Sequence, residues 1–412
     1  MDYFAITTVI VVLAALFGYL NVRFLKLPNT IGLMLITIVF TLVVIGISYF
    51  DDTLLDAERY IITHIDFRTV LMDVMLSFLL FAGALHTNFE QLKVQRWPVL
   101  AFATLGVVLS TFLVGSAMFF VLQLLSLDIA YIYCLLFGAL ISPTDPIAVL
   151  GILKQAGVPK KLETKIVGES LFNDGVGVVV FLTIYKIASL GGDNVEAIDI
   201  LALFGQEVIG GVALGLLLGF ITFRLMRSID DYDIEVIITL AAVMAGTAIA
   251  QALHLSAPLA MVTAGLMVGM DTIRESSMSK ITESYVDKFW ELIDILLNTV
   301  LFVLIGMEML VLSFEGSYIL AGLLAIPIIL LCRYTSLLLP INFFKKKLDF
   351  VPNTNLIMTW GGLRGGISIA LALGLTEVMH RDLFLVITYV VVVFSILVQG
   401  LTVEKLVKRL KV

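Results

Sequence analysis

Charged residues are scarce in this sequence. They make up 14% of its 412 residues, whereas hydrophobic residues make up 60% and the mean hydropathy is +1.07. Soluble globular chains are roughly 25% charged, so the composition excludes a soluble enzyme and a disordered chain. The net charge of −7 provides no basic surface for phosphates, which excludes nucleic acid as a partner. Only two cysteines occur, Cys134 and Cys332, and both lie in apolar runs, so no disulfide framework is expected.

Long apolar runs occupy most of the chain. A helix needs about 20 mostly apolar residues to cross the hydrocarbon core of a bilayer. By this measure the sequence predicts an all-α polytopic membrane protein with thirteen transmembrane helices. The predicted spans lie near 3–22, 31–50, 69–86, 98–124, 130–152, 162–190, 200–226, 233–252, 256–271, 291–311, 318–339, 354–375 and 383–403. The longest connector, 272–290, is amphipathic and is expected either to lie along the membrane surface or to form a solvated loop.

Lysine and arginine are distributed unequally between the two sets of connectors. Twenty of the 26 basic residues would lie on one side, among them Lys165 and the run 345–347. Only Arg59, Arg68 and Arg381 would lie on the other side. Because basic connectors tend to remain in the cytoplasm, we expect a multi-pass protein of the cytoplasmic (inner) membrane. Its N-terminus would be outside the cell and its C-terminus in the cytoplasm.

The predicted spans nevertheless contain charged residues, and seven of them are candidates for function. They are Asp73, Asp145, Glu169, Asp174, Glu308, Arg333 and Arg364. Each charge near the centre of a helix costs about 2.5–3.5 kcal/mol on insertion scales, so the set would cost roughly 20 kcal/mol if left unpaired. One or two structural ion pairs would account for part of the set. The whole set indicates a function that requires charge inside the membrane.

Two prolines flank an aspartate in the fifth span. Neither Pro143 nor Pro146 has an amide hydrogen, and each also disfavours helical dihedral angles in the residue before it. The helix is therefore expected to break at Thr144 and Asp145, and the freed carbonyls of Ala139 and Ser142 are expected to be unpaired. Irregular backbone at this depth is tolerated only inside protein or beside a water-filled cavity. A simple proline kink is the alternative, but it does not explain the position of the aspartate.

The sixth span carries four polar residues on two successive turns of the predicted helix. On a helix, Glu169 and Asn173 stack at i,i+4, and Ser170 and Asp174 do the same. Oxygen atoms are the ligands that hard cations prefer. The same carboxylates can also bind protons, since two neighbouring acids disfavour double ionisation. The predicted cage for an alkali cation consists of Asp145, Asp174, Ser170 and the carbonyl of Thr144.

A second interruption is expected in the twelfth span. Four glycines surround Arg364 within 360–366, and each weakens a helix by about 1 kcal/mol relative to alanine. If spans 1–6 and 8–13 are two inverted repeats, the fifth and twelfth spans correspond. Repeat one would cover about 1–190, a linker span about 200–226 and repeat two about 233–412. Inverted repeats with discontinuous helices crossing at the midplane are typical of secondary transporters.

At these residues the sequence resembles the cation/proton antiporter superfamily, specifically its electroneutral NhaP and sodium/hydrogen-exchanger branch. The resemblance spans essentially the whole chain. The shared motifs are Ser142-Pro-Thr-Asp-Pro146, Gly168-Glu-Ser-Leu-Phe-Asn-Asp174, Phe302-Val-Leu-Ile-Gly306, Arg333 with the apolar run after it, and Gly361-Gly-Leu-Arg-Gly365. The Asn173-Asp174 pair is the feature of the electroneutral branch. The long cytoplasmic tail of animal exchangers is absent, which favours a prokaryotic transporter.

The resemblance implies exchange of one Na⁺ or Li⁺ for one proton, by alternating access and without a cofactor. It implies a structural ion pair between Glu169 and Arg333. It further implies a homodimer in the lipid bilayer, with a core of spans 4–6 and 11–13 that moves against a dimerisation part made of the remaining spans. Asn173 and Arg364 would support the site. Asp73 is a further candidate, because some relatives carry an acid near the ion path in the third span.

Two alternative functions are compatible with parts of the sequence. Within transport, the chain would be a K⁺/H⁺ exchanger or a cation channel, since the cage size is not readable from sequence. From a different class, two intramembrane aspartates are also found in intramembrane aspartyl proteases. Those enzymes carry Tyr-Asp and Gly-x-Gly-Asp motifs, and neither Asp145 nor Asp174 lies in such a context.

Overall fold

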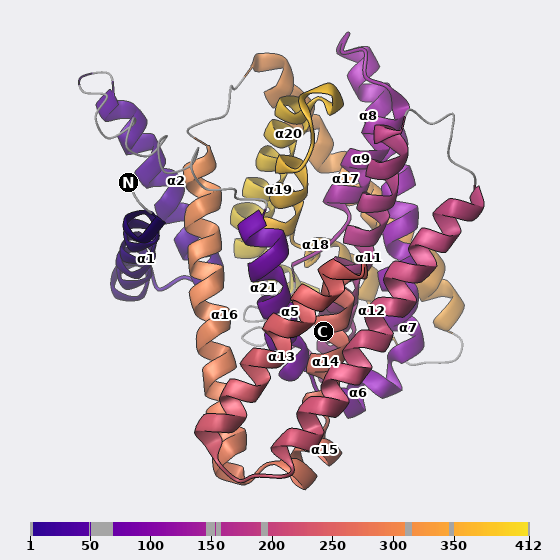
Figure 1. The fold of residues 1–412 in the computed structure, drawn as a ribbon. Helices are drawn as coiled ribbons and strands as arrows, with labels where there is room; N and C mark the ends of the chain where they lie inside the picture. The colour runs from indigo at the N-terminus through magenta and orange to yellow at the C-terminus, as the bar shows by residue number, and fades with distance from the viewer. Residues whose placement is uncertain are drawn as a thin grey trace.

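The computed structural model describes residues 3–48, 50, 69–145, 153, 158–190, 197–309, 315–345 and 350–410. Within these ranges all regular structure is helical (Figure 1). The helices are α1 (Tyr3–Leu20), α2 (Asn29–Ser48), α5 (Leu76–Leu85), α6 (Phe89–Val94), α7 (Arg96–Ala101), α8 (Val107–Leu124), α9 (Tyr131–Ile141), α11 (Lys160–Ser189), α12 (Ala197–Met226), α13 (Tyr232–Ala252), α14 (Ala257–Val268), α15 (Asp271–Ser277), α16 (Lys280–Glu308), α17 (Gly316–Phe344), α18 (Thr354–Trp360), α19 (Gly366–Leu373), α20 (Arg381–Phe394) and α21 (Gly400–Leu410). Short π-helical stretches lie at Asn21–Leu25, Val70–Met75, Phe102–Gly106 and Ser395–Gln399, and a 3₁₀ turn at Glu377–Met379.

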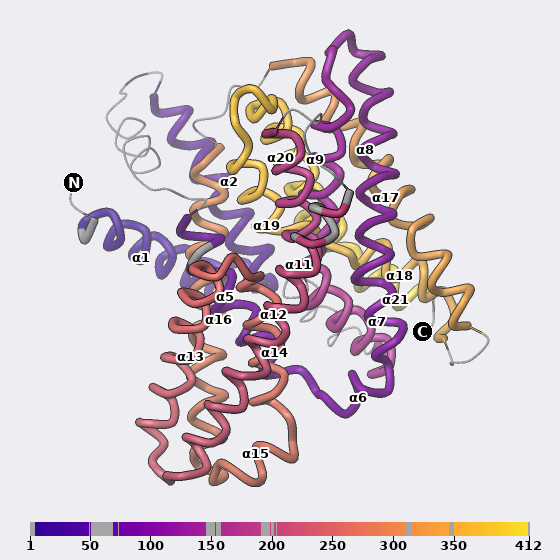
Figure 2. Tube along the Cα trace, turned by 45° about the vertical axis from the view of Figure 1, so that its right-hand side comes forward, coloured from indigo at the N-terminus to yellow at the C-terminus, as the bar shows by residue number. Residues whose placement is uncertain are grey.

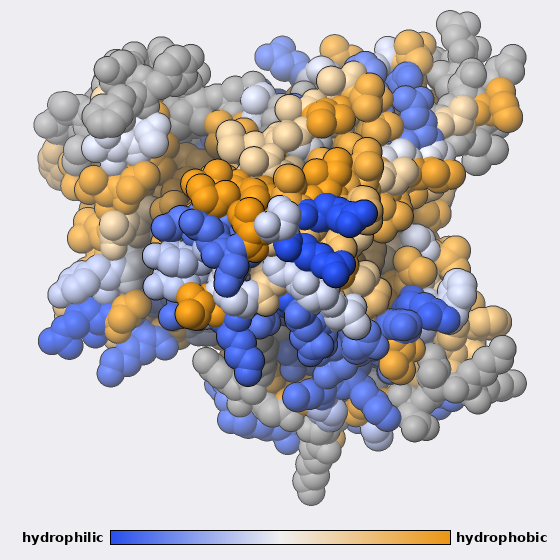
Figure 3. All heavy atoms as spheres, turned by 60° about the horizontal axis from the view of Figure 1, so that its bottom comes forward, coloured by the Kyte–Doolittle hydropathy of each residue, from blue (hydrophilic) through white to orange (hydrophobic). Residues whose placement is uncertain are grey.

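The predicted class of an all-helical membrane protein is confirmed. In the described ranges, nine helices are long and apolar enough to cross a bilayer, and α9 and α14 are shorter apolar helices. Hydrophilic side chains gather on the face that lies at the bottom of Figure 1, where α15 and the lower ends of α13 and α16 meet (Figures 1 and 3). Hydrophobic side chains border that face, as expected where a protein passes from water into lipid.

The predicted connector 272–290 is mostly helical rather than a loop, and its residues in α15 are partly exposed. Its first part forms α15, and its second part is the beginning of α16, which continues without interruption into the tenth predicted span. Ser279 caps α16, because its hydroxyl accepts a hydrogen bond from the amide of Thr282 at 3.3 Å. Val286 and Trp290 are fully buried against the protein. Because these two residues are four positions apart, they lie on one side of α16, and this apolar side packs against the protein.

Lys165 also lies elsewhere than the connector pattern predicts. It belongs to α11 and is completely buried, with its Nζ 3.8 Å from the centre of the Phe350 ring. A lysine close to the face of an aromatic ring is stabilised by the negative charge of that face. Packing of the segment around Phe350 over this end of α11 therefore removes Lys165 from solvent.

The shorter helices α9 and α19 lie in the interior, beside α20 (Figures 1 and 2). Every residue of α9 from Cys134 to Ile141 is buried. Helix α9 packs closely on α8, since a Cβ added at Gly138 would lie 2.2 Å from the Thr111 carbonyl oxygen. Small residues allow such close approach between helices in membranes. This packing holds the end of α9 in the middle of the molecule.

Candidate functional site

Helix α9 ends at Ile141, and Ser142–Asp145 have no helical structure. Pro143 has no amide hydrogen to continue the helix, and Pro146 disfavours helical dihedral angles at Asp145. The structure therefore interrupts the chain where the two prolines predict, although the residues after Asp145 up to 152 lie outside the described part. The Ser142 hydroxyl donates a 2.6 Å hydrogen bond to the Gly138 carbonyl and closes the last helical turn.

A second interruption separates α18 from α19. The chain at Gly361–Gly365 is not helical, as its glycines predict. The two interruptions meet directly, because the Asp145 amide donates a 2.8 Å hydrogen bond to the Leu363 carbonyl. This backbone bond holds the two unwound segments together in the interior.

Arg364 binds the backbone at the end of α9. Its Nη1 donates hydrogen bonds to the carbonyls of Ser142 and Pro143, the latter at 2.8 Å. The side chain is only 2% exposed. The prediction that the freed Ser142 carbonyl is unpaired is therefore wrong. An unpaired carbonyl in hydrocarbon costs several kcal/mol, and the guanidinium supplies the missing donor.

Helix α11 presents its predicted polar residues to the first interruption. The amide of Asn173 makes two hydrogen bonds to Thr144: its Oδ1 accepts from the backbone N–H at 3.2 Å, and its Nδ2 donates to Oγ1 at 2.8 Å. The Ser170 hydroxyl lies 2.9 Å from the same Oγ1. Asn173 and Ser170 are both buried. These contacts fix Thr144 on α11 and place Asp145 next to Asp174 around one pocket.

Glu169 and Arg333 form a buried ion pair between α11 and α17. Nη2 of Arg333 donates to Oε2 of Glu169 at 2.8 Å, and Nη1 lies at 2.5 Å from Oε1. The two side chains are 1% and 2% exposed. The two parallel contacts are the bidentate geometry in which arginine binds carboxylates most strongly. Nδ2 of Asn173 also lies 3.5 Å from Oε1 of Glu169. The side chain of Asn173 therefore contacts both Thr144 and the ion pair.

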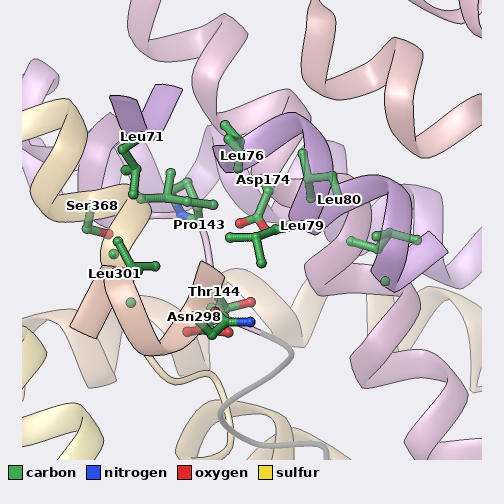
Figure 4. A pocket seen from close by; sticks show the side chains of 16 residues that line it. Leu71, Leu76, Leu79, Leu80, Pro143, Thr144, Asp174, Asn298, Leu301 and Ser368 are labelled. Atoms are coloured by element: carbon green, nitrogen blue, oxygen red, sulfur yellow. The ribbon is translucent and has the colours of Figure 1, made fainter. Parts of the chain in front are cut away.

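A pocket with about 630 Å³ of empty volume, including open space at its mouth, lies between the two interruptions and α5, α11 and α16 (Figure 4). Thr144, Asp145 and Asp174 line it together with leucines of α5. Asp174 is 3% exposed, and its Oδ1 has no hydrogen-bond partner in the described part of the protein. A buried carboxylate oxygen without a partner is costly, and the cost is offset when a cation or a proton binds to it. The arrangement therefore places oxygen atoms that can bind a small positive ion around one pocket.

A family model described as "Sodium/hydrogen exchanger, transmembrane" matches residues 11–409. The chain belongs to the sodium/hydrogen exchanger family. This exchanger is 49% identical over 406 residues to the Na⁺/H⁺ antiporter NhaP of Pseudomonas aeruginosa, covering 97% of this chain and 95% of the relative. It is 35% identical to the Na⁺/H⁺ antiporter NhaH of Halobacillus dabanensis, covering 94% of this chain and 93% of that relative.

The fold is similar to a solved structure of the sodium proton antiporter MjNhaP1 from Methanocaldococcus jannaschii. The TM-score is 0.75 at 19% identity, and the match covers 98% of this chain and 97% of that one. The predicted NhaP branch is confirmed, and the exchanger is a transporter rather than an enzyme. The aspartyl-protease alternative is thereby excluded.

The structure brings together most of the sequence-predicted site residues of the exchanger. Three of the four predicted ligands line the pocket, whereas Ser170 lies behind Thr144 and contacts its hydroxyl. Asp73 lies in the Val70–Met75 stretch, but its side chain is outside the described part. Glu308 is buried at the other end of α16 and does not line the pocket.

Two buried polar residues of the pocket are missing from the sequence prediction. Asn298 of α16 and Ser368 of α19 are 6% and 1% exposed, and both line the pocket. The Ser368 hydroxyl has no hydrogen-bond partner among the described residues. The available signal for Asn298 was an amide within an otherwise apolar run, four residues after an aspartate. Serine carries no such signal, since it is common in membrane helices.

Gly365 is expected to be essential for the position of Asp145. A Cβ at this residue would lie 2.5 Å from Oδ2 of Asp145 and 2.8 Å from its Cβ, closer than real Cβ contacts. Gly365→Ala should therefore displace Asp145 and slow exchange by roughly tenfold or more, since shifts of about 1 Å have large effects on positioned groups. The measurement is Na⁺-driven proton movement in proteoliposomes. Gly18→Ala, where nothing lies within 4 Å, is the matched control and should exchange like the wild type; equal activity of the two variants would contradict the expectation.

Proposed function

We propose that the exchanger moves Na⁺ or Li⁺ in one direction and H⁺ in the other across the cytoplasmic membrane of a prokaryote. Cation and proton would compete for Asp145 and Asp174, with Thr144 and Ser170 as neutral oxygen ligands of the cation. The observation that carries the proposal is Asp174, which lines the pocket and whose buried Oδ1 has no hydrogen-bond partner among the described residues. Family membership and the named relatives support the same exchange.

The proposed exchange is electroneutral. Asn173 is neutral and its amide is occupied by Thr144, so it does not titrate in the cycle. Asp174 would carry either one cation or one proton, while Asp145 keeps one charge state. Each crossing then moves the same net charge, and membrane potential does not drive the reaction. Glu169 and Arg333 would remain paired throughout and hold α11 against α17.

We further propose the architecture in which this exchange takes place. Thirteen spans would form two inverted repeats, about 1–190 and 233–412, joined by a span at about 200–226. The interrupted helix α9 and the interrupted pair α18 and α19 would correspond, and their backbone contact supports this arrangement. The N-terminus would be outside and the C-terminus in the cytoplasm. A homodimer would hold the dimerisation parts still, while the cores of spans 4–6 and 11–13 carry the site across the bilayer.

The dependence of cation affinity on pH tests the shared site. Because binding of a proton excludes the cation, the Na⁺ concentration for half-maximal exchange should rise as pH falls below the apparent pKa of the site. The rise approaches tenfold per pH unit for one competing proton, about 1.4 kcal/mol per unit. The maximal rate should change much less. The experiment measures exchange in proteoliposomes over two pH units, with Na⁺, Li⁺ and K⁺.

Several outcomes would count against the proposal. A constant half-maximal concentration with a collapsing maximal rate would show that pH acts at another place. A current under symmetric ionic conditions, or a rate that rises strongly with membrane potential, would contradict electroneutral exchange. Conduction without proton coupling, or transport of K⁺ in preference to Na⁺, would favour a channel or a K⁺/H⁺ exchanger.

A further inference from the structure

Asn298 brings an amide group of α16 to the ion pocket. The side chain is 6% exposed and lines the same space as Asp145 and Asp174 (Figure 4). Helix α16 packs against α2 and α5, and it contributes Asn298 and Leu301 to the lining of the pocket. The pocket therefore has a polar group on a wall that is otherwise formed by apolar residues such as Leu301.

The orientation of this amide is determined by Asp294, one turn earlier on α16. Nδ2 of Asn298 donates to the Asp294 backbone carbonyl at 2.9 Å and to its carboxylate Oδ1 at 3.1 Å. An asparagine amide has two N–H donors and one oxygen acceptor. Because both donors are directed at Asp294, the oxygen is the atom that remains for a ligand in the pocket.

Charge also favours a cation at this place. Asp145 lines the pocket, and the carboxylate of Asp294 lies next to the amide of Asn298. Two acidic side chains near the pocket favour a positive ion there. A neutral amide oxygen has a further property that a carboxylate lacks. It binds a cation but does not bind a proton in the working range of pH, so it increases affinity for the cation alone.

We propose that Oδ1 of Asn298 is a ligand of the transported cation and that Asp294 is the positioning residue that holds this amide. The inference rests on the proposed function, because it adds a ligand to the site at Asp145 and Asp174. Asparagine oxygens are ordinary ligands of hard cations. Asn298 thus contributes to discrimination between the cation and the proton, which compete for the same carboxylates.

The test is the Na⁺ concentration for half-maximal exchange in proteoliposomes of Asn298→Ala. Loss of one oxygen ligand should raise it about tenfold, a factor that corresponds to about 1.4 kcal/mol. The maximal rate should stay within roughly twofold, since the groups that carry protons remain. In a pH titration without Na⁺, the apparent pKa for proton binding at the site should equal that of the wild type. Asn298→Leu is measured as well, because the leucine side chain has nearly the same shape as that of asparagine. The result then does not depend on the folding of a single variant.

Thr299→Ala is the matched control on the neighbouring position of α16. The hydroxyl of Thr299 donates to the Ile295 carbonyl in its own helix, and the residue does not line the pocket. This variant should have wild-type affinity. If Asn298→Ala also has wild-type affinity while Asp174→Ala is inactive, the ligand role of Asn298 is wrong and the proposed function stands. If Asp174→Ala still exchanges, the proposed site itself is wrong.

A double-mutant cycle tests the role of Asp294. Asp294→Ala should lower Na⁺ affinity, since the amide is no longer held, but it should have no further effect in the Asn298→Ala background. Residues that act through one another show this non-additivity. Additive effects in the double variant would show that Asp294 acts on the cation independently, which would overturn its role as a positioning residue.

Discussion

Asp174→Ala is expected to reduce Na⁺/H⁺ exchange to the background of empty liposomes, with the protein still folded. The substitution removes a cation ligand and a proton acceptor from the pocket at once. It should not destabilise the protein, because the buried Oδ1 has no hydrogen-bond partner in the described part. Removal of a buried polar group that is not hydrogen-bonded is neutral or stabilising. We therefore expect a melting temperature in detergent equal to or above that of the wild type.

The control for this variant is Asp128→Ala. Asp128 is an exposed acid between α8 and α9, so its loss changes the net charge equally but leaves the pocket intact. It should exchange at the wild-type rate. Asp174→Asn separates shape from charge, since it preserves the volume but does not bind a proton, and it should be as inactive as the alanine variant. Near-wild-type exchange by either Asp174 variant would remove this residue from the ion path.

Arg333→Ala is expected to have the second largest effect, and the effect should be on stability. The substitution leaves the carboxylate of Glu169 buried at 1% exposure without its partner. Removing one member of a buried ion pair costs about 3–5 kcal/mol, because the remaining charge is not compensated. The melting temperature should fall markedly, and transport should fall with it. Both are measured on the same purified preparation, by thermal unfolding in detergent and by exchange in proteoliposomes.

The double variant Glu169→Leu/Arg333→Leu is the decisive comparison. Replacing both members of a buried pair by apolar residues of similar size is often neutral, since no charge is stranded. We expect the double variant to melt closer to the wild type than Arg333→Ala does. If Arg333→Ala instead melts like the wild type and only transport is lost, Arg333 takes part in ion movement and its assignment as a structural residue is wrong.

Local chemistry explains why part of the site was predictable. Pro143 has no amide hydrogen and Pro146 acts on the residue before it, so the interruption at Thr144 and Asp145 follows from these residues alone. The i,i+4 spacing of Ser170 and Asp174 likewise assigns them to one face of a helix. These inferences require no knowledge of distant parts of the chain.

Other features of the site depend on contacts between distant parts of the chain. Arg364 binds the Ser142 carbonyl across 222 residues of sequence, and no local pattern identifies a side chain that supplies a missing donor at that distance. The sequence does not identify Asn298 as a pocket residue, because the role of an amide in an apolar helix depends on its neighbours in the fold. The sequence places Lys165 in a connector, since basic residues near span ends are usually exposed.

The sequence by itself determined that this is a helical membrane protein of the sodium/hydrogen exchanger family, and that one helix must be interrupted beside an aspartate. Composition, proline chemistry and helical periodicity act within a few residues and are therefore readable along the chain. Only the tertiary structure decided which groups face the pocket. Packing of α19 against α11 and α16 brings the amide of Asn298 and the backbone of Gly365 to the pocket that the carboxylates line. Such selection depends on contacts between helices far apart in the sequence, and these contacts exist only in the folded protein.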